Sequence, residues 1–275
     1  MKPPMTKKIS VALIGAGSMG GALLKGWIAG GVIDAATSAV FDPAPRDEIA
    51  TLIGQARLCL NPARREGAFD VLVVAVKPQS AADALAPFPP LAARASVLSV
   101  MAGRSIAALG RSLPGARAII RAMPNLPAAV GAGATALFAP ADVSPTDRRV
   151  AETLMRAIGE IAWVEDEAGI DAATAVSGSG PAYFFLLAEA LAEAGRAAGL
   201  TAETSALLAR ATLVGAGAFV AHDKRALDAL RRAVASPGGT TEAALGVLDG
   251  ETQEVRKLIK RAVEAAARRA HELTE

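Results

Sequence analysis

Three glycines near the start of the chain are spaced to bring backbone close to a negatively charged ligand. Residues 15–20 read Gly-Ala-Gly-Ser-Met-Gly, between an apolar run at 9–14 and a helix-forming stretch that continues through Trp27. The order strand, tight turn and helix leaves free N–H groups at the helix start, where they attract phosphate. A lone Gly-x-Gly-x-x-Gly pattern also suits a plain strand-to-helix connection, but this context predicts dinucleotide binding.

A second apolar strand ends in Asp42, at the distance from the glycine turn where a carboxylate commonly bonds the ribose 2′-hydroxyl of NAD. Arg46 follows shortly, and a guanidinium there suits the 2′-phosphate of NADP instead. Asp42 also suits a simple cap for the next helix. The sequence therefore leaves the choice between NADPH and NADH open.

Two further strand ends carry polar residues. The fourth strand runs into Lys77 and Pro78, and we expect Lys77 to meet cofactor phosphate or a substrate carboxylate rather than remain solvated. The sixth strand leads into a proline-bracketed loop containing Asn125, which suits either a bond to a carboxamide or substrate, or a role as a turn residue.

The last chemical motif lies far along the chain, at Ser236-Pro-Gly-Gly-Thr-Thr241. A helix is expected to end near Ala235 and a new one to begin at Thr240 or Thr241. Unpaired N–H groups of Gly239, Thr240 and Thr241 would form an anion site suited to a carboxylate. An ordinary threonine cap with Glu242 behind it fits the same residues equally well.

Alternating strand and helix signals determine what positions these residues. Strands are predicted at 9–14, 39–42, 57–60, 71–76, 96–100, 118–121, 133–138 and 161–164. Such apolar runs are typical of a parallel sheet covered on both faces, whose ligands bind beyond the carboxyl ends of the strands. We therefore predict an α/β fold class, with an N-terminal Rossmann-like doubly wound sheet over 1–165 and an all-α dimerisation and substrate-binding domain over 166–275.

The C-terminal domain contains an unusually apolar helix. The stretch 202–221 carries few charges, and a helix that is apolar on most faces must be surrounded. About 110 residues of helix offer little interior, so we infer packing against a second subunit. The alternative is a compact monomeric bundle.

Composition argues against a nucleic-acid-binding, a metal-binding or a membrane-spanning protein. The net charge of +2 gives no general attraction to nucleic acid or to an anionic membrane. Cys59 is alone and the histidines, His222 and His271, lie far apart, so no metal site is expected and Cys59 is expected in the core. Charges including Arg196 and Arg210 interrupt the apolar stretch at 183–218, so no membrane span is expected. We expect a cytoplasmic protein.

Five motifs occur together in a recognisable order: Gly15-Ala-Gly-Ser-Met-Gly20, Ala75-Val-Lys-Pro-Gln79, Met123-Pro-Asn125, Ser177-Gly-Ser-Gly-Pro-Ala-Tyr183 and Ser236-Pro-Gly-Gly-Thr-Thr241. Over residues 9–264 the chain resembles the pyrroline-5-carboxylate reductase family. The resemblance implies hydride transfer from NADPH or NADH to the ring C=N bond of 1-pyrroline-5-carboxylate, which gives L-proline, the last step of proline synthesis, without a metal.

The resemblance also implies roles for individual residues. The substrate carboxylate is held by backbone N–H groups at Gly239, Thr240 and Thr241, with Ser236 and Gly238 beside them, and the hydroxyl of Thr241 meets the ring nitrogen. The resemblance places cofactor contacts at Ile14, Gly15, Ala16, Gly17, Ser18, Met19, Asn61, Ala75, Val76, Lys77 and Pro78. Their spacing in the glycine turn or their places at strand ends make Gly20, Asp42, Arg46 and Asn125 further candidate cofactor residues. The helical domain is expected to form an interlocked homodimer, and such dimers often assemble into decameric rings.

Two departures from the family pattern stand out. Leu126 replaces a threonine in the loop after Asn125, and Asp42-Pro43 replaces a small or basic pair in many relatives. Rival families fit less well. A dehydrogenase resembling the 3-hydroxyacid enzymes would need a lysine on the first long helix of the second domain, yet none lies between Lys77 and Lys224. A non-catalytic nucleotide sensor would have no use for residues 236–241.

Overall fold

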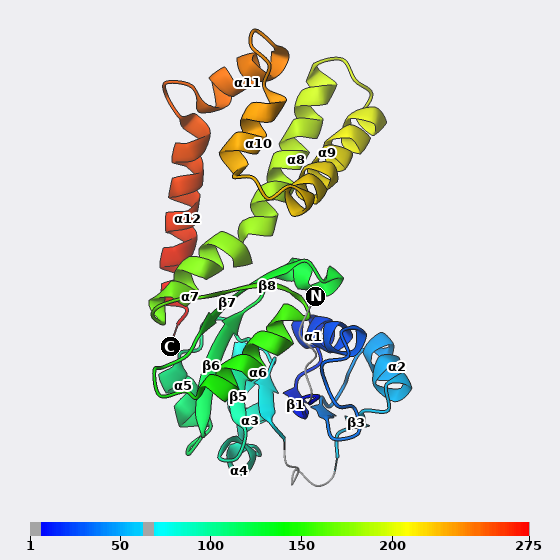
Figure 1. The fold of residues 1–275 in the computed structure, drawn as a ribbon, viewed down its shortest axis with the longest axis vertical. Helices are drawn as coiled ribbons and strands as arrows, with labels where there is room; N and C mark the ends of the chain where they lie inside the picture. The colour runs from blue at the N-terminus through cyan, green and yellow to red at the C-terminus, as the bar shows by residue number, and fades with distance from the viewer. Residues whose placement is uncertain (1–6, 63–68, 275) are drawn as a thin grey trace. The chain divides into compact units, whose positions relative to one another are not determined.

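The computed structural model describes residues 7–62 and 69–274, folded as two compact units. One unit combines the chain up to Ser179 with the C-terminal end from Ala266, and the other is Gly180–Ala265 (Figure 1). The domain division predicted at 165–166 falls earlier than this. Helix α7 (Ala168–Ala173) and the π-helical turn η3 (Thr174–Gly178) belong to the unit that contains the sheet.

An eight-stranded sheet with the order β3-β2-β1-β4-β5-β6-β7-β8 forms the first unit, which we call the sheet unit. The chain goes outward from β1 to β3 on one side and then resumes at β4 on the other side, as a doubly wound sheet does. The strands are β1 (Val11–Ile14), β2 (Ala39–Phe41), β3 (Cys59–Leu60), β4 (Val71–Val74), β5 (Ser96–Ser99), β6 (Ala118–Met123), β7 (Gly133–Phe138) and β8 (Gly159–Trp163). All eight predicted strands are present.

One pairing departs from the predicted parallel pattern. Strand β7 runs antiparallel to β6, with Arg121 opposite Phe138, whereas β7 and β8 are parallel. The connection from β6 to β7 holds only the short turn η2 (Leu126–Val130), which is too little chain for the crossover that parallel neighbours require.

Helices cover both faces of the sheet because alternate strand residues point to opposite sides. Leu13 and Val73 pack in a core with α1 (Ser18–Ala29), α2 (Asp47–Gln55) and α6 (Pro145–Arg156). Ala12 and Leu72 pack on the opposite face, where the sequence supplies α3 (Ala81–Leu85), α4 (Pro89–Ala92) and α5 (Ile106–Ser112) after the 3-10 turn η1 (Pro78–Ser80). Residues on both sides of these strands are therefore apolar.

Cys59 contradicts its predicted place in the core. It lies on β3, an edge strand of two residues, and is exposed. The apolar character of the stretch at 57–60 comes from Leu58, which is buried just before the strand begins.

The second unit, which we call the helical unit, confirms the predicted helices. It contains α8 (Gly180–Ala197), α9 (Ala202–His222), α10 (Leu227–Val234), α11 (Thr240–Asp249) and most of α12 (Glu254–Glu272). Helices α8 and α9 pack together, and Ser205 donates to the Ala192 carbonyl at 2.6 Å. Their other faces carry large exposed side chains, which include Phe184, Leu187, Leu207, Val214 and Phe219.

Helix α9 alone, among the residues described, is long and apolar enough to cross a membrane. Its most apolar window has a mean hydropathy of 1.4 and is only 11% buried. Length and composition are weak evidence, because helices inside soluble proteins meet the same criterion.

Candidate active site

The glycine turn lies at the carboxyl ends of β1 and β4, the point where the order of the strands in the sheet reverses. Gly15 has φ of +86°, and a Cβ there would lie 2.8 Å from the Ala75 carbonyl oxygen. A Cβ on Gly20 would collide with the Gly15 carbonyl. A Cβ on Gly17 would meet nothing within 4 Å, so the space in front of it is open. Ligands of doubly wound sheets bind at this place.

Asp42 reaches the glycine turn from the end of β2. Its Oδ2 accepts from the Ala16 N–H at 2.7 Å, and its Oδ1 accepts from the Ala44 N–H at 2.9 Å. Asn61, just after β3, holds the Asp42 backbone from the other side: Asn61 Oδ1 accepts from the Asp42 N–H at 2.9 Å, and Asn61 Nδ2 donates to the Asp42 carbonyl at 2.6 Å. These contacts bring the first three strand ends together.

The candidate cations lie at the same edge of the sheet. Arg46 donates from Nη2 to the Ser18 hydroxyl at 2.9 Å, so its guanidinium lies beside the first residue of α1. Lys77 is exposed and precedes η1, while Ala75 and Val76, just after β4, lie against the glycine turn. A phosphate at the start of α1 would meet backbone N–H groups and positive charge together.

Asn125 is buried and fully engaged within the sheet unit. Its Nδ2 donates to the Ser177 carbonyl at 2.9 Å, and its Oδ1 accepts from the Ala134 N–H at 2.9 Å. The side chain thus connects the loop after β6 to η3 and to β7. Asn125 is also the N-cap residue of η2, and its carbonyl accepts from the Ala128 N–H at 3.1 Å, in line with the predicted turn role. A contact with the cofactor stays a prediction.

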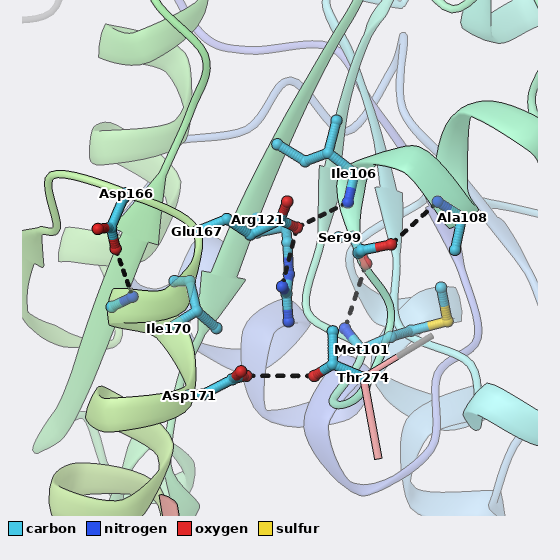
Figure 2. A network of polar contacts seen from close by, with 12 residues as sticks. Ser99, Met101, Ile106, Ala108, Arg121, Asp166, Glu167, Ile170, Asp171 and Thr274 are labelled. Carbon is cyan, nitrogen blue, oxygen red and sulfur yellow. Dashed lines mark hydrogen bonds and ion pairs between the residues drawn. The ribbon is translucent and has the colours of Figure 1, made fainter. Parts of the chain in front are cut away.

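A partly buried ion pair that the sequence analysis did not identify joins β6 to the start of α7. Arg121 is 3% exposed, and its Nη1 donates to Glu167 Oε1 at 2.9 Å. The same carboxylate oxygen accepts from the Ile106 N–H at 2.7 Å, as Figure 2 shows. A charged residue inside the apolar strand sequence Ala-Ile-Ile-Arg-Ala-Met was the available signal, because a buried charge needs a partner.

The predicted anion site at the start of α11 is present in part. Gly239 is the N-cap, and its N–H donates to the Ser236 carbonyl at 3.0 Å, so the prediction that this N–H is unpaired is wrong. The Thr240 and Thr241 N–H groups have no protein acceptor among the residues described. The predicted threonine cap is also wrong, since no side chain caps this helix and Glu242 bonds the Gly238 N–H instead, at 2.6 Å.

Helix α11 is tied to its neighbours at its other end. Asp249 accepts from Arg231 of α10 and from Arg256 of α12 at 2.5 Å in both pairs. The hydrogen bond from Arg256 lowers the pKa of Asp249, and Arg231 adds to this while burial opposes it. These two arginines compensate the unfavourable position of a carboxylate at a helix C-terminus.

Within residues 7–62 and 69–274, no group of three or more His, Cys, Asp or Glu side chains could hold a metal ion.

Comparison with known proteins decides the family. The chain is 40% identical over 270 residues to the pyrroline-5-carboxylate reductase of Pseudomonas aeruginosa, covering 96% of this chain and 97% of that one. The chain belongs to the pyrroline-5-carboxylate reductase family. A relative of the same name from Synechocystis is 38% identical and covers 96% of this chain and 98% of its own.

Domain and structural matches agree with this membership. Residues 167–273 match the family described as pyrroline-5-carboxylate reductase dimerisation, and residues 10–103 match the one described as NADP oxidoreductase coenzyme F420-dependent. A pyrroline-5-carboxylate reductase from Coxiella burnetii has a TM-score of 0.89 at 37% identity, covering 98% of this chain and all of that one. The Plasmodium falciparum pyrroline carboxylate reductase, solved with NADP bound, has a TM-score of 0.78 at 29% identity and covers 97% of this chain and 98% of that chain.

Membership in the reductase family confirms the predicted fold class and the predicted enzyme class, an oxidoreductase that uses NAD(P)H. The match over residues 167–273 also confirms a C-terminal dimerisation domain. The roles of individual residues stay predictions. The structure brings the glycine turn, Asp42, Arg46 and Asn61 together in the sheet unit, and it places residues 236–241 in the helical unit.

Proposed function

We propose that this chain reduces the C=N bond of 1-pyrroline-5-carboxylate with hydride from NADPH or NADH and releases L-proline, the last step of proline biosynthesis. The observation that carries the proposal is the match to reductases of that name over almost the whole chain. The rival two-domain dehydrogenases lack this support, and they would need a lysine that α8 does not carry.

The cofactor, when bound, supplies the hydride, and the chain supplies position and polarity. The sheet unit offers the open face of Gly17 and the N–H groups at the start of α1 to the pyrophosphate. The helical unit offers the Thr240 and Thr241 N–H groups to the substrate carboxylate, and α11, at ten residues, is long enough to add its dipole. The Thr241 hydroxyl hydrogen-bonds the ring nitrogen of the substrate.

Little further catalytic machinery is needed. A protonated imine is already a good hydride acceptor, so fixing the ring and bonding its nitrogen accounts for much of the rate increase. Ser236 and Gly238 shape the turn that presents these groups, with Gly238 at φ of +70°.

Replacing Thr241 tests the substrate site. Thr241→Ala should lower turnover about 10- to 100-fold, the effect of losing one hydrogen bond to a charged group. The Kd for NADH or NADPH should be unchanged, and Thr241→Ser, which keeps the hydroxyl, should recover most of the rate. Steady-state kinetics with pyrroline-5-carboxylate and both cofactors provides the measurement.

The outcomes separate two claims. Full activity in Thr241→Ala would remove the role of its hydroxyl but not the reaction. Failure of the wild-type protein to reduce pyrroline-5-carboxylate with either cofactor would remove the proposed function itself.

We further propose that the active form is a homodimer joined through the helical unit, located in the cytoplasm, with neither nucleic acid nor membrane as a partner. Support comes from the dimerisation-domain match and from the exposed apolar side chains of α8 and α9, which a second copy would cover. Assembly of dimers into a decamer stays a prediction from the family resemblance.

A further inference from the structure

We infer that this chain selects a nucleotide with a free ribose 2′-hydroxyl, NADH, and that Asn61 is the positioning residue that holds the selecting Asp42 carboxylate in place. The inference rests on the proposed function only in that the cofactor is a nicotinamide dinucleotide.

Asp42 is fixed before any nucleotide arrives. Its two carboxylate oxygens accept one N–H each, from Ala16 and Ala44, at 2.7 and 2.9 Å. A carboxylate oxygen offers about two acceptor sites, so each oxygen keeps one for a ribose hydroxyl. The Ala16 contact places the carboxylate against the glycine turn at the end of β2, where doubly wound sheets receive the adenosine ribose.

The position of Asp42 depends on Asn61. The Asn61 amide oxygen accepts from the Asp42 N–H, and its Nδ2 donates to the Asp42 carbonyl. Both backbone polar groups of Asp42 are therefore held by one side chain. Asn61 itself has φ of +47°, a left-handed conformation that asparagine tolerates better than most residues. The family resemblance assigned Asn61 to direct cofactor contact, whereas its geometry in this chain directs it at Asp42.

The charges near this strand end disfavour a 2′-phosphate. A phosphate dianion beside Asp42 would be repelled, and Asp47 adds negative charge at the start of α2. Lys25 is already paired with Glu48. Arg46 is the opposing feature: it is exposed, and its Nη2 is engaged with the Ser18 hydroxyl. Because salt screens an exposed cation, we expect the Asp42 carboxylate to dominate the selection.

Binding of nucleotide fragments tests the inference without any turnover. Calorimetry on the full-length protein would compare ADP-ribose with 2′-phospho-ADP-ribose. We expect wild type to bind ADP-ribose at least about tenfold more tightly, the scale of one charged hydrogen bond. Asp42→Ala should abolish this preference. Asn61→Ala should reduce it in the same direction.

A double-mutant cycle distinguishes positioning from direct contact. If Asn61 acts through Asp42, Asn61→Ala should change selectivity little once Asp42 is alanine. Asp34→Ala is the matched control, because Asp34 also caps a loop, accepting from the Ala36 N–H at 3.1 Å, but before β2 instead of after it. This control should keep wild-type selectivity.

Three results would overturn the inference. Tighter binding of 2′-phospho-ADP-ribose by wild type would refute the NADH preference. Loss of that binding in Arg46→Ala would show that Arg46 binds the 2′-phosphate. Equal effects of Asn61→Ala in both backgrounds would refute the positioning role. An unchanged circular dichroism spectrum and an unchanged urea unfolding midpoint verify that each variant is folded. None of these results depends on whether pyrroline-5-carboxylate is the substrate.

Discussion

At the scale of single residues, Asn125 shows most clearly how a candidate site residue can have a structural role. Its amide connects three segments of the sheet unit and is 8% exposed. Asn125→Ala should lower the free energy of unfolding by about 1–3 kcal/mol, because the Ser177 carbonyl and the Ala134 N–H lose their partner. Nucleotide affinity should hardly change.

Urea unfolding followed by circular dichroism measures the first effect, and calorimetry with ADP-ribose measures the second. Arg149→Ala, on an exposed position of α6, is a control that should leave both unchanged. If Asn125→Ala instead weakened nucleotide binding strongly at unchanged stability, the predicted cofactor contact would be the better explanation.

Residue spacing predicted the local features of the site and missed the distant ones. The roles of Gly15 and Gly20 follow from a fixed turn geometry within six residues, so the pattern alone was sufficient. The partner of Asn125 lies 52 positions away, and Arg121 pairs with Glu167 across 46 positions. Only the folded sheet brings those residues together, so no local pattern could identify them.

At the scale of elements, the orientation of α11 depends on Asp249. Asp249→Asn removes the charge that Arg231 and Arg256 share, so the helix start that carries Thr240 and Thr241 should be held less firmly. We expect the substrate KM to rise roughly two- to fivefold, the effect of losing one exposed ion pair. The affinity for NADH or NADPH should be unchanged. Asp228→Asn, which breaks only an i,i+4 pair with Arg232 inside α10, is the matched control.

The pH dependence of Asp249 has a definite sign. Because its pKa is lowered in the folded protein, its stabilising effect is complete above its ordinary value of 3.8 and is lost as the pH falls through the lower folded value. Thermal melting of wild type and Asp249→Asn should therefore differ by a constant amount near neutral pH and converge in acid. A difference that changed between about pH 6 and 8 would implicate another group.

Element types were predictable where one strong pattern sets them, and pairings were not. Apolar runs placed β1, β2 and β4, whose residues are all buried, because strands covered on both faces carry no polar alternation. The antiparallel β6–β7 pair depends on how a short connection folds back, which residue types do not encode. Likewise, the return of the C-terminal end to the sheet unit is made by contacts such as Thr274 with Asp171 at 3.2 Å, which span 103 positions.

At the scale of the whole molecule, the apolar surface of α8 and α9 requires an explanation. Val214 is 66% exposed and Leu187 is 62% exposed, on helices that belong to a matched dimerisation domain. Soluble monomers rarely expose apolar patches of this extent, and a second copy presents a surface of the same kind. A protein partner of this kind would also cover the apolar residues that give α9 its mean hydropathy.

A single charge placed in this surface should therefore separate the subunits. Wild-type protein should scatter light as at least twice its chain mass of 27.8 kDa, whereas Val214→Glu, which buries a carboxylate in an apolar interface, should shift the mass toward 27.8 kDa on dilution. Thr51→Glu, on an exposed position of α2, should leave the mass at the wild-type value. Because Val214 belongs to the helical unit, nucleotide-fragment binding by the sheet unit should survive the substitution even where reductase activity is lost. A wild-type protein that remained monomeric at micromolar concentration would refute the dimer and favour the compact monomeric bundle.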